Sequence, residues 1–319
     1  MRIDLATYQY DVVIVGAGPA GMCAGMYAGR SMLKTVVLER GFPGGELLNT
    51  ELVEDYPGFE TILGHDLAQK FADHAAKFGA EFRNGVVIEG VRKRGDGMFE
   101  TRAESGDIYV SPTVIVTAGG TPIKLGVPGE VEYAGKGVSY CAICDGAFFK
   151  NQVVAVVGGG DTAMEESLFL THHATKVLVV HRRGELRASK IMAERARKNP
   201  KIEFIWHSAV VEILGETGHG AGGVKGMVIE DVRSGERRTV ELQGVFVAIG
   251  HKPNTDLFKD QLDLYDTGYV KLSGDGSTRT SVEGVFAAGD VADHIYRQAV
   301  TAAGTGCMAA IDAERFLSH

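Results

Sequence analysis

Two stretches of this chain repeat one order of strand, glycine-rich turn and helix, and this repeat constrains the fold more than any other feature. The run Asp-Val-Val-Ile-Val at 11–15 continues into Gly-Ala-Gly-Pro-Ala-Gly at 16–21, and the run 152–157 continues into Gly-Gly-Gly-Asp-Thr-Ala at 158–163. Short β-branched apolar runs are typical of strands buried in a parallel sheet. The glycines permit a tight turn, the approach of a pyrophosphate and close packing of helix on strand. Each stretch therefore predicts a dinucleotide-binding unit.

The residue after the second strand of each unit distinguishes the two. Strand 35–38 ends at Glu39, an acid spaced to bind a ribose hydroxyl. The matching residue of the second unit is His181, and arginines follow at positions 182, 183 and 187. Arginine binds phosphate bidentately, whereas an acid would repel a ribose 2′-phosphate. The second unit is therefore expected to bind NADPH rather than NADH; a solvated basic turn is the alternative interpretation.

The order of elements predicts two domains, one inserted into the other. Residues 86–116 and 201–249 each show short strands and glycine turns typical of a β-meander, the second beginning with Ile202–Trp206. Crossings near Thr121-Pro122 and Lys252-Pro253 bracket the inserted segment. We predict an α/β fold of two dinucleotide-binding, Rossmann-like, three-layer domains with β-meanders. The first domain is expected to span residues 1–120 and 254–319, and the second residues 121–253.

A Cys-x-x-Cys pair, Cys141 and Cys144, is followed at once by Asp145. Thiols at this spacing can close a disulfide and exchange with another one through a mixed intermediate. An acid beside them could move the protons that this chemistry needs. The alternative is half of a zinc site, but zinc needs four ligands, and the other cysteines, at 23 and 307, stand alone in small-residue runs. We therefore expect a redox pair and no metal.

Composition limits the partners. The net charge is −8 without a block of basic residues, which argues against nucleic acid or an anionic membrane surface. No apolar segment is long enough to cross a bilayer, and the first ten residues lack the apolar core of a signal peptide. Four cysteines in 319 residues do not make a disulfide framework. We expect a cytoplasmic protein without a membrane or nucleic-acid partner.

The last helix, expected at 298–317, contains Gly304 and Gly306, each of which weakens a helix by about 1 kcal/mol relative to alanine. A close neighbour, such as a cofactor or backbone, would explain why both glycines are tolerated. Just before this helix, Asp290 ends a strand and is placed to bind a cofactor hydroxyl; capping the next helix is the alternative.

Over essentially its full length the chain resembles the low-molecular-weight, bacterial-type thioredoxin reductases. Four groups of residues carry the resemblance: 16–21, 141–146, 158–166 with 181–187, and 284–290 with 296–310. The resemblance implies FAD on the first unit and NADPH on the second. It also implies electron transfer from NADPH through FAD and the cysteine pair to thioredoxin, and a homodimer.

The resemblance also implies roles for single residues. Cys144 corresponds to the thiol that faces the flavin, Cys141 to the thiol that attacks the partner's disulfide, and Asp145 to the acid–base residue. The expected NADPH contacts are Gly158, Gly160, Asp161, Thr162, Ala163, His181, Arg182, Arg183 and Arg187. The expected FAD contacts are Gly16, Gly18, Pro19, Ala20, Gly21, Glu39, Gly44, Gly45, Glu46, Leu47, Asn49, Val87, Ala118, Gly119, Gly289, Asp290, Arg297, Gln298 and Ala299.

Some positions depart from the family pattern. Glu46 stands where glutamine is common, and a carboxylate near the flavin would disfavour its anionic reduced form unless it points away or is protonated. Gly184 and Leu186 replace an acid and an aromatic residue between the arginines. The rival functions are a flavin dithiol enzyme linked to oxygen or ferredoxin, and a redox-sensing flavoprotein without turnover.

Chain order also predicts a domain rotation. The second glycine turn and the cysteine pair both lie in the inserted segment, whereas the flavin is expected in the other domain. Nicotinamide and disulfide must each reach the flavin, and Cys141 must also reach a protein substrate. Two short crossings are typical of a hinge, so we expect two alternating domain arrangements.

Overall fold

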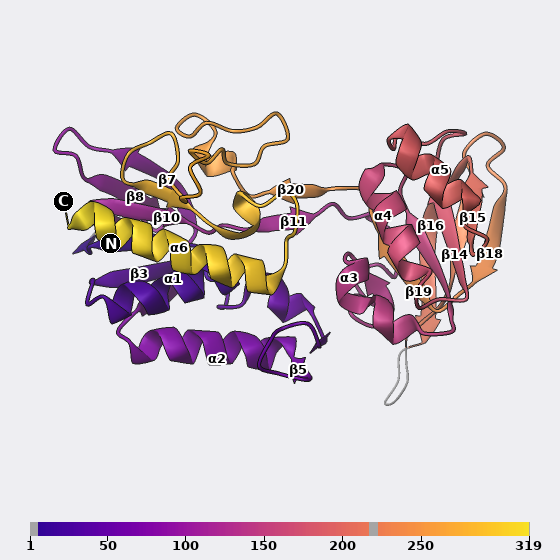
Figure 1. Ribbon diagram of the computed structural model, residues 1–319, viewed down its shortest axis with the longest axis horizontal. Helices are drawn as coiled ribbons and strands as arrows, with labels where there is room; N and C mark the ends of the chain where they lie inside the picture. Colours follow the sequence, from indigo (N-terminus) through magenta and orange to yellow (C-terminus); the bar gives the residue numbers. More distant parts are fainter. Residues whose placement is uncertain (1–5, 217–222, 319) are drawn as a thin grey trace, which may run out of the picture. The chain divides into compact units, whose positions relative to one another are not determined.

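The computed structural model describes residues 6–216 and 223–318. It divides into two compact units (Figure 1). The first unit consists of Met1–Thr121 and Lys252–His319, and the second of Pro122–His251. The chain passes between them on two strands that pair with each other, β11 (Gly120–Pro122) and β20 (His251–Pro253).

The first unit is built on a five-stranded parallel sheet of order β21-β10-β2-β3-β6. Its strands are β2 (Val12–Val15), β3 (Thr35–Glu39), β6 (Glu81–Asn84), β10 (Thr113–Val116) and β21 (Val285–Ala287). Three helices accompany it, α1 (Pro19–Arg30), α2 (Gly64–Lys77) and α6 (Ala299–Leu317). A meander of order β1-β9-β8-β7 comprises β1 (Thr7–Gln9), β7 (Ile88–Lys93), β8 (Phe99–Ala103) and β9 (Ile108–Ser111).

Alternating side chains of the apolar strands create the layers of this unit. On β2, Val12 and Ile14 join the core cluster of α1 and α6, whereas Val13 and Val15 join the cluster that contains Phe99 of the meander. All four β2 residues are buried, as expected for a strand covered on both faces. Helices, sheet and meander therefore form three layers.

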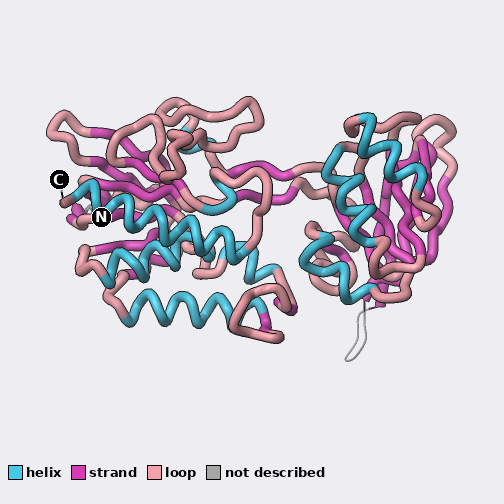
Figure 2. The backbone as a smooth tube through the Cα atoms, in the orientation of Figure 1, coloured by secondary structure: helices cyan, strands magenta, loops and turns pink. Residues whose placement is uncertain are grey.

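The second unit repeats this plan (Figure 2). Its parallel sheet has the order β12-β19-β13-β14-β15, with β12 (Val138–Ser139), β13 (Val153–Val157), β14 (Lys176–His181), β15 (Ile202–Trp206) and β19 (Gly244–Val247). One sheet face packs with α4 (Asp161–Leu170) and α5 (Lys190–Lys198). The other packs with the antiparallel meander β16 (Ser208–Glu216), β17 (Gly223–Asp231) and β18 (Arg237–Glu241).

Short elements complete the two units. They are β4 (Leu52–Val53), β5 (Ile62–Leu63), α3 (Ala142–Asp145), and the 3₁₀ turns η1 (Gly45–Asn49), η2 (Gly146–Phe149), η3 (Asp256–Phe258) and η4 (Gly289–Val291). The predicted fold class, two Rossmann-like α/β units with meanders, is confirmed.

Two details of the prediction need correction. Ile202–Trp206 belongs to the parallel sheet as β15, paired with β14, and not to the second meander. Its edge position leaves alternate residues partly exposed, which gives it the pattern of a meander strand. The prediction also missed β1, which adds a parallel edge strand beside β9.

The glycines of α6 differ from each other. A Cβ on Gly306 would lie 2.8 Å from the carbonyl carbon of Ala20 and 2.9 Å from its Cα, so the expected close neighbour is the backbone of α1. A Cβ on Gly304 would meet nothing within 4 Å. The expectation of a close backbone neighbour is therefore confirmed for Gly306, whereas no protein atom takes that place at Gly304.

Candidate functional site

The cysteine pair forms a disulfide at the start of α3. The Cα atoms of Cys141 and Cys144 are 5.3 Å apart, and both residues are half-buried. The Cys141 sulfur accepts a hydrogen bond from the main-chain N–H of Cys144 at 3.2 Å. The main-chain N–H of Asp145 donates to the carbonyl oxygen of Cys141 at 3.1 Å. The short helix therefore holds both sulfurs and the acid in one turn of chain.

Packing anchors this turn in the second unit. The Ser139 hydroxyl accepts a hydrogen bond from the N–H of Cys141 at 3.1 Å. Ala142 is buried in the same cluster as Phe149, whose ring packs edge-on against Phe246 at 5.2 Å between centroids. In contrast, Ile143 and Phe148 are 59% and 40% exposed. The residues around the disulfide are therefore packed into the core of the second unit, and two apolar side chains next to it are exposed.

The first glycine turn links β2 to α1. A Cβ on Gly16, which has a φ of +106°, would lie 2.8 Å from the carbonyl carbon of Thr117, so this position requires glycine. A Cβ on Gly21 would lie 2.8 Å from the Thr117 hydroxyl oxygen, whereas one on Gly18 would meet nothing. No side chain caps α1, because Gly18 is its N-cap residue. Thr117 therefore packs against one side of the turn, and the free main-chain N–H groups at the start of α1 are accessible to an anion.

Glu39 and the loop after it join this turn. The two carboxylate oxygens of Glu39 accept hydrogen bonds from the N–H groups of Ala17 at 2.8 Å and Gly41 at 2.9 Å. The N–H of Gly44 donates to the carbonyl of Ala17 at 2.8 Å. A Cβ on Gly45 would lie 3.1 Å from the Cα of Gly18. The predicted acid and both glycines of the loop therefore lie together at the carboxyl end of the sheet.

Asp290 reaches the same end from the last part of the chain. A Cβ on Gly289 would lie 2.8 Å from the Cβ of Ala20, which places η4 beside the start of α1. Burial raises the pKa of Asp290 to about 6; Asp293 and Glu46 add to the rise, and Arg297 opposes it. The alternative role of Asp290 as a helix cap does not apply to α6, because Gln298 and Thr301 form the capping box there. A buried carboxyl with this pKa can bind a hydroxyl.

Other residues predicted to bind FAD differ in which of their groups a ligand could reach. Leu47 is buried in a cluster with Val53 and Leu67, so only its backbone is available to a ligand. Glu46 accepts a hydrogen bond from the Asn49 amide at 3.1 Å, and both residues are exposed.

Three more predicted positions lie on the loops that leave the sheet. Val87 is 41% exposed and follows Val86, whose N–H donates to the carbonyl of Glu39 at 2.9 Å. Ala118 and Gly119 follow β10, with Thr117 between the strand and Ala118.

The second glycine turn links β13 to α4. A Cβ on Gly158 would lie 2.7 Å from the Cβ of Ala163, and one on Gly160 would meet nothing within 4 Å. Gly160 is the N-cap residue, and no side chain caps α4. As in the first turn, one glycine is tightly packed against the protein, and another, at the helix N-terminus, has open space beside it.

His181 lies beneath this turn rather than in front of it. The residue is 5% exposed, and a Cβ on Gly159 would lie 2.7 Å from its Nε2 atom. Burial lowers the pKa of His181, so the ring is neutral at pH 7. Its Nε2 is buried and has no hydrogen-bond partner among the described residues. His181 therefore fills the space behind the turn, at the position where an acid would otherwise stand.

The arginine loop, residues 182–189, is exposed and held at both ends. Near its start, the N–H of His207 donates to the carbonyl of Arg183 at 3.3 Å, and a Cβ on Gly184 would lie 2.7 Å from the His207 ring. Near its end, the N–H groups of Arg187 and Ala188 donate to the carbonyl of Gly159 at 2.7 and 3.1 Å. In the part of the chain that the structure describes, the guanidinium groups of Arg182, Arg183 and Arg187 form no ion pair with a carboxylate. They are available for a phosphate.

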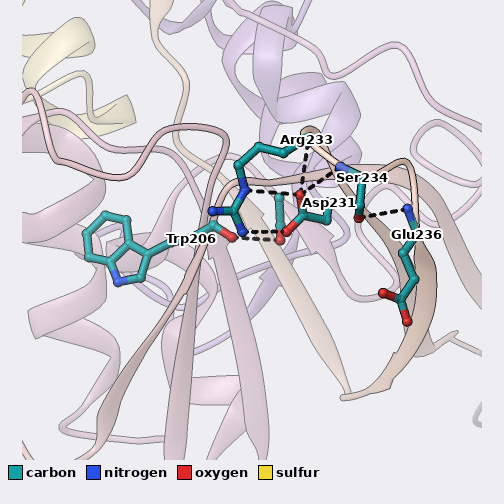
Figure 3. A network of polar contacts seen from close by, with 6 residues as sticks. Trp206, Asp231, Arg233, Ser234 and Glu236 are labelled. Atoms are coloured by element: carbon teal, nitrogen blue, oxygen red, sulfur yellow. Dashed lines mark hydrogen bonds and ion pairs between the residues drawn. The ribbon is translucent and has the colours of Figure 1, made fainter.

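Asp231 organises the turn after β17 (Figure 3). The carboxylate of Asp231 accepts hydrogen bonds from the N–H groups of Arg233 at 2.8 Å and Ser234 at 3.2 Å. Its other oxygen pairs with the Arg233 guanidinium at 2.9 Å, so this arginine is engaged within the turn itself. The turn directs the N–H of Val232 to the carbonyl of His207 at 2.7 Å. The meander thereby fixes the position of the arginine loop.

The two turns fit dinucleotides. Both have an open glycine, an uncapped helix N-terminus and strands that end at the same edge, which are the features that bind a pyrophosphate. The first adds the acids Glu39 and Asp290, which suit hydroxyl groups, and the second adds three free guanidinium groups, which suit a 2′-phosphate.

Sequence reasoning missed three residues of these sites. Gly159 accepts the bonds that hold the arginine loop, His207 braces that loop, and Ser189 bonds to Asp161. The only sequence signal was at Gly159, the middle glycine of three. The other two act through contacts between distant positions and leave no local pattern.

Among residues 6–216 and 223–318, no group of three or more histidine, cysteine and acidic side chains is arranged to hold a metal ion. No helix in the same ranges has the length and apolar character to cross a membrane.

Comparison with protein families gives a match over nearly the whole chain. The model of the pyridine nucleotide-disulphide oxidoreductases matches residues 10–306. A thioredoxin reductase of Streptomyces clavuligerus is 50% identical over 311 residues, covering 97% of this chain and 94% of the relative. A thioredoxin reductase of Rickettsia prowazekii is 48% identical over 309 residues, covering 96% of this chain and 98% of the relative.

Solved structures give the same result. The crystal structure of thioredoxin reductase from Streptococcus pyogenes is 41% identical, with a TM-score of 0.90 and coverage of 97% of this chain and 98% of that one. The thioredoxin reductase from Giardia duodenalis is 38% identical, with a TM-score of 0.91, and covers 98% of this chain and 100% of that one.

Proposed function

The chain belongs to the thioredoxin reductases, a family of FAD- and NADPH-dependent pyridine nucleotide-disulphide oxidoreductases, and from this premise we propose the residues through which it works. Its activity is the NADPH-dependent reduction of a protein disulfide, that of thioredoxin, through its own cysteine pair. The observation that carries the proposal is the Cys141–Cys144 disulfide on a four-residue helix that also holds Asp145.

The two cysteines have different roles in the exchange with the substrate disulfide. FAD held by the first unit would supply the two electrons, taken from NADPH, that reduce the Cys141–Cys144 disulfide to two thiols. Cys141 then attacks the substrate disulfide as a thiolate and forms a mixed disulfide, and one substrate sulfur leaves. Cys144 attacks the Cys141 sulfur, which re-forms the Cys141–Cys144 disulfide and releases the second substrate thiol. Asp145 holds or delivers the proton that each thiolate exchanges.

Each unit is assigned one dinucleotide. The first unit binds FAD: the glycine turn and the start of α1 hold the pyrophosphate, Glu39 and Asp290 bind hydroxyl groups, and Gly44, Gly45 and Arg297–Ala299 surround the ring system. The open amides at Gly18 and the buried carboxyl of Asp290 support this assignment. The second unit binds NADPH, with Gly158, Gly160, Thr162 and Ala163 at the pyrophosphate.

The arginine loop gives the preference for NADPH over NADH. Arg182, Arg183 and Arg187 bind the 2′-phosphate, and His181 fills the space behind the turn without adding a negative charge. Replacing Arg182 and Arg183 with alanine is expected to raise KM for NADPH far more than KM for NADH. Equal use of both cofactors by the unmodified protein would contradict the assignment.

A homodimer and a cytoplasmic location complete the proposal. Val300, Met308 and Ile311 recur at helical spacing on α6 and are 40%, 41% and 36% exposed, and Tyr27 on the neighbouring α1 is 36% exposed. An apolar stripe of this kind is suited to a second copy of the chain. Cys23 and Cys307 are free thiols, in keeping with a reducing compartment.

The function is tested by NADPH oxidation coupled to the reduction of thioredoxin, with Cys141→Ser and Cys144→Ser variants. Both variants are expected to lose turnover, and only Cys141→Ser should leave the Cys144 thiolate beside the flavin, seen as a long-wavelength absorbance band. Cys307→Ser is the matched control, because this thiol lies in another unit, and it should retain full turnover. Hydrogen peroxide formed in proportion to the NADPH consumed would instead favour an oxygen-linked enzyme, and no NADPH oxidation would favour a ferredoxin-linked one.

A further inference from the structure

Asp161 and Ser189 connect the two parts of the NADPH site. Asp161 is the first residue of α4, directly after the glycine turn, and Ser189 ends the arginine loop. Oδ1 of Asp161 accepts two hydrogen bonds from Ser189, from its N–H and from its hydroxyl, both at 2.8 Å. These bonds lower the pKa of Asp161, so the acceptor is a full carboxylate at neutral pH.

The bonds continue a short ladder along the loop. Arg187 and Ala188 donate their N–H groups to the carbonyl of Gly159, and Ser189 donates to Asp161. Three consecutive loop residues are thereby tied to the turn that would hold the pyrophosphate. The hydroxyl bond from Ser189 is the only member of this ladder made by a loop side chain.

The direction of these contacts indicates what Asp161 does. A carboxylate beside a pyrophosphate would repel it, so Asp161 is a poor direct contact for the dinucleotide. Its Oδ1 atom is instead occupied by Ser189. Arg187 lies two residues before Ser189, so the position of its guanidinium depends on how the loop end is held.

We propose that Asp161 and Ser189 form a latch that sets the distance between the pyrophosphate turn and the arginines, and so determines selectivity for the 2′-phosphate. This inference rests on the proposed assignment of NADPH to the second unit. Asp161 and Ser189 are positioning residues, because they act through Arg187 and do not touch the phosphate. Arginine binds phosphate in a fixed fork geometry, so a small displacement of the loop weakens 2′-phosphate binding while the rest of the dinucleotide binds as before.

The test uses the oxidised, FAD-containing protein and two probes, 2′,5′-ADP and 5′-AMP, with binding measured by titration calorimetry. Four variants are compared: Ser189→Ala, Ser189→Thr, Asp161→Ala and Asp161→Asn. Thr175→Ala is the matched control, because the Thr175 hydroxyl bonds to the carbonyl of Gln152 at 3.0 Å beyond the opposite end of β14. Hydrogen exchange of the Arg187 and Ala188 amides reports the position of the loop without any ligand.

The latch predicts a specific pattern. Ser189→Ala removes one hydrogen bond and should weaken 2′,5′-ADP binding about fivefold. Asp161→Ala removes both bonds and should weaken 2′,5′-ADP binding at least as much. Binding of 5′-AMP should not weaken, and exchange at Arg187 and Ala188 should become faster. Ser189→Thr and Asp161→Asn keep the hydroxyl and an acceptor oxygen, so both should retain most of the selectivity, as should Thr175→Ala.

Three results would overturn the latch. An equal loss for both probes in Asp161→Ala would mean that Asp161 serves the shared part of the nucleotide. Normal selectivity in Ser189→Ala would mean that the ladder holds without the side-chain bond. A similar affinity of the unmodified protein for both probes would overturn the latch together with the NADPH assignment, which distinguishes the two failures.

Discussion

The packing of α1 against α6 can be tested by one pair of substitutions in the same helix. Gly306→Ala would put a methyl group against the backbone of Ala20, whereas Gly304→Ala would put the same group into open space. Both changes raise helix propensity by the same amount, about 1 kcal/mol. The difference between the two variants therefore isolates the steric cost at the helix crossing.

The geometry sets the size of that cost. The new Cβ at 306 would lie 2.8 Å from the carbonyl carbon of Ala20 and 2.9 Å from its Cα, and even closer to its oxygen, so the helices must separate. The interface consists largely of alanines, including Ala24, Ala309 and Ala313, which cannot rotate to make room. Overpacking of this kind costs about 1–3 kcal/mol. We expect the free energy of unfolding of Gly306→Ala to be about 3 kcal/mol lower than that of Gly304→Ala, at the upper end of that range.

Both variants are unfolded in urea at several protein concentrations, and FAD content is measured in parallel. The concentration series is needed because Gly304 lies on the exposed face of α6 proposed for the dimer, and a weaker dimer shifts the midpoint on dilution. Ala20 lies in the glycine-rich stretch 16–21 at the start of α1, so Gly306→Ala is also expected to lose FAD more readily. Equal stability of the two variants would refute the reasoning, because the helices would then be free to separate without cost.

Three further predictions follow from individual contacts. Burial raises the pKa of Asp290 from 3.8 to about 6, so the stability of the FAD-free protein falls as pH rises through this window. Urea unfolding of Asp290→Asn should match the unmodified protein at pH 4 and exceed it by about 3 kcal/mol above pH 7; a constant difference would contradict the assignment. Gly159→Ala should lower Tm because its Cβ meets the His181 ring, whereas Gly160→Ala should keep Tm and weaken NADP⁺ and NAD⁺ alike. Ile311→Glu places a charge in the α6 stripe and should convert a dimer to monomers in sedimentation, and an unchanged mass would remove that face from the interface.

The sequence was sufficient for the features that depend on neighbouring residues. Strand, glycine turn and helix occur in order at 16–21 and 158–163, and each strand that is apolar on both faces proved to be buried in a parallel sheet. The pairing of Cys141 with Cys144 also follows from local spacing, because only two residues separate them and the sulfurs stay within reach of each other. Local geometry determines all of these, so pattern alone predicts them.

Edge effects are where the pattern failed. β15 has the half-exposed alternation of a meander strand, but it pairs with β14 because the parallel sheet offers a free edge there. β1 pairs with β9, about a hundred residues later, and its three residues carry no signal of that partner. A strand that is buried on one face only has the same sequence pattern in either sheet, so the pattern does not reveal which sheet the strand joins.

Only the tertiary structure decided how the predicted residues act. The sequence placed His181 among the NADPH contacts, and the fold puts its ring beneath Gly159, where burial keeps it neutral. It placed Asp161 among the same contacts, and in the fold that carboxylate accepts hydrogen bonds from Ser189. The two α6 glycines have the same local context, and only the crossing with α1 makes Gly306 necessary. The physical reason is the same in each case: residue type and spacing determine which groups a turn can offer, but a side chain's burial, charge and partner depend on distant segments that packing brings against it.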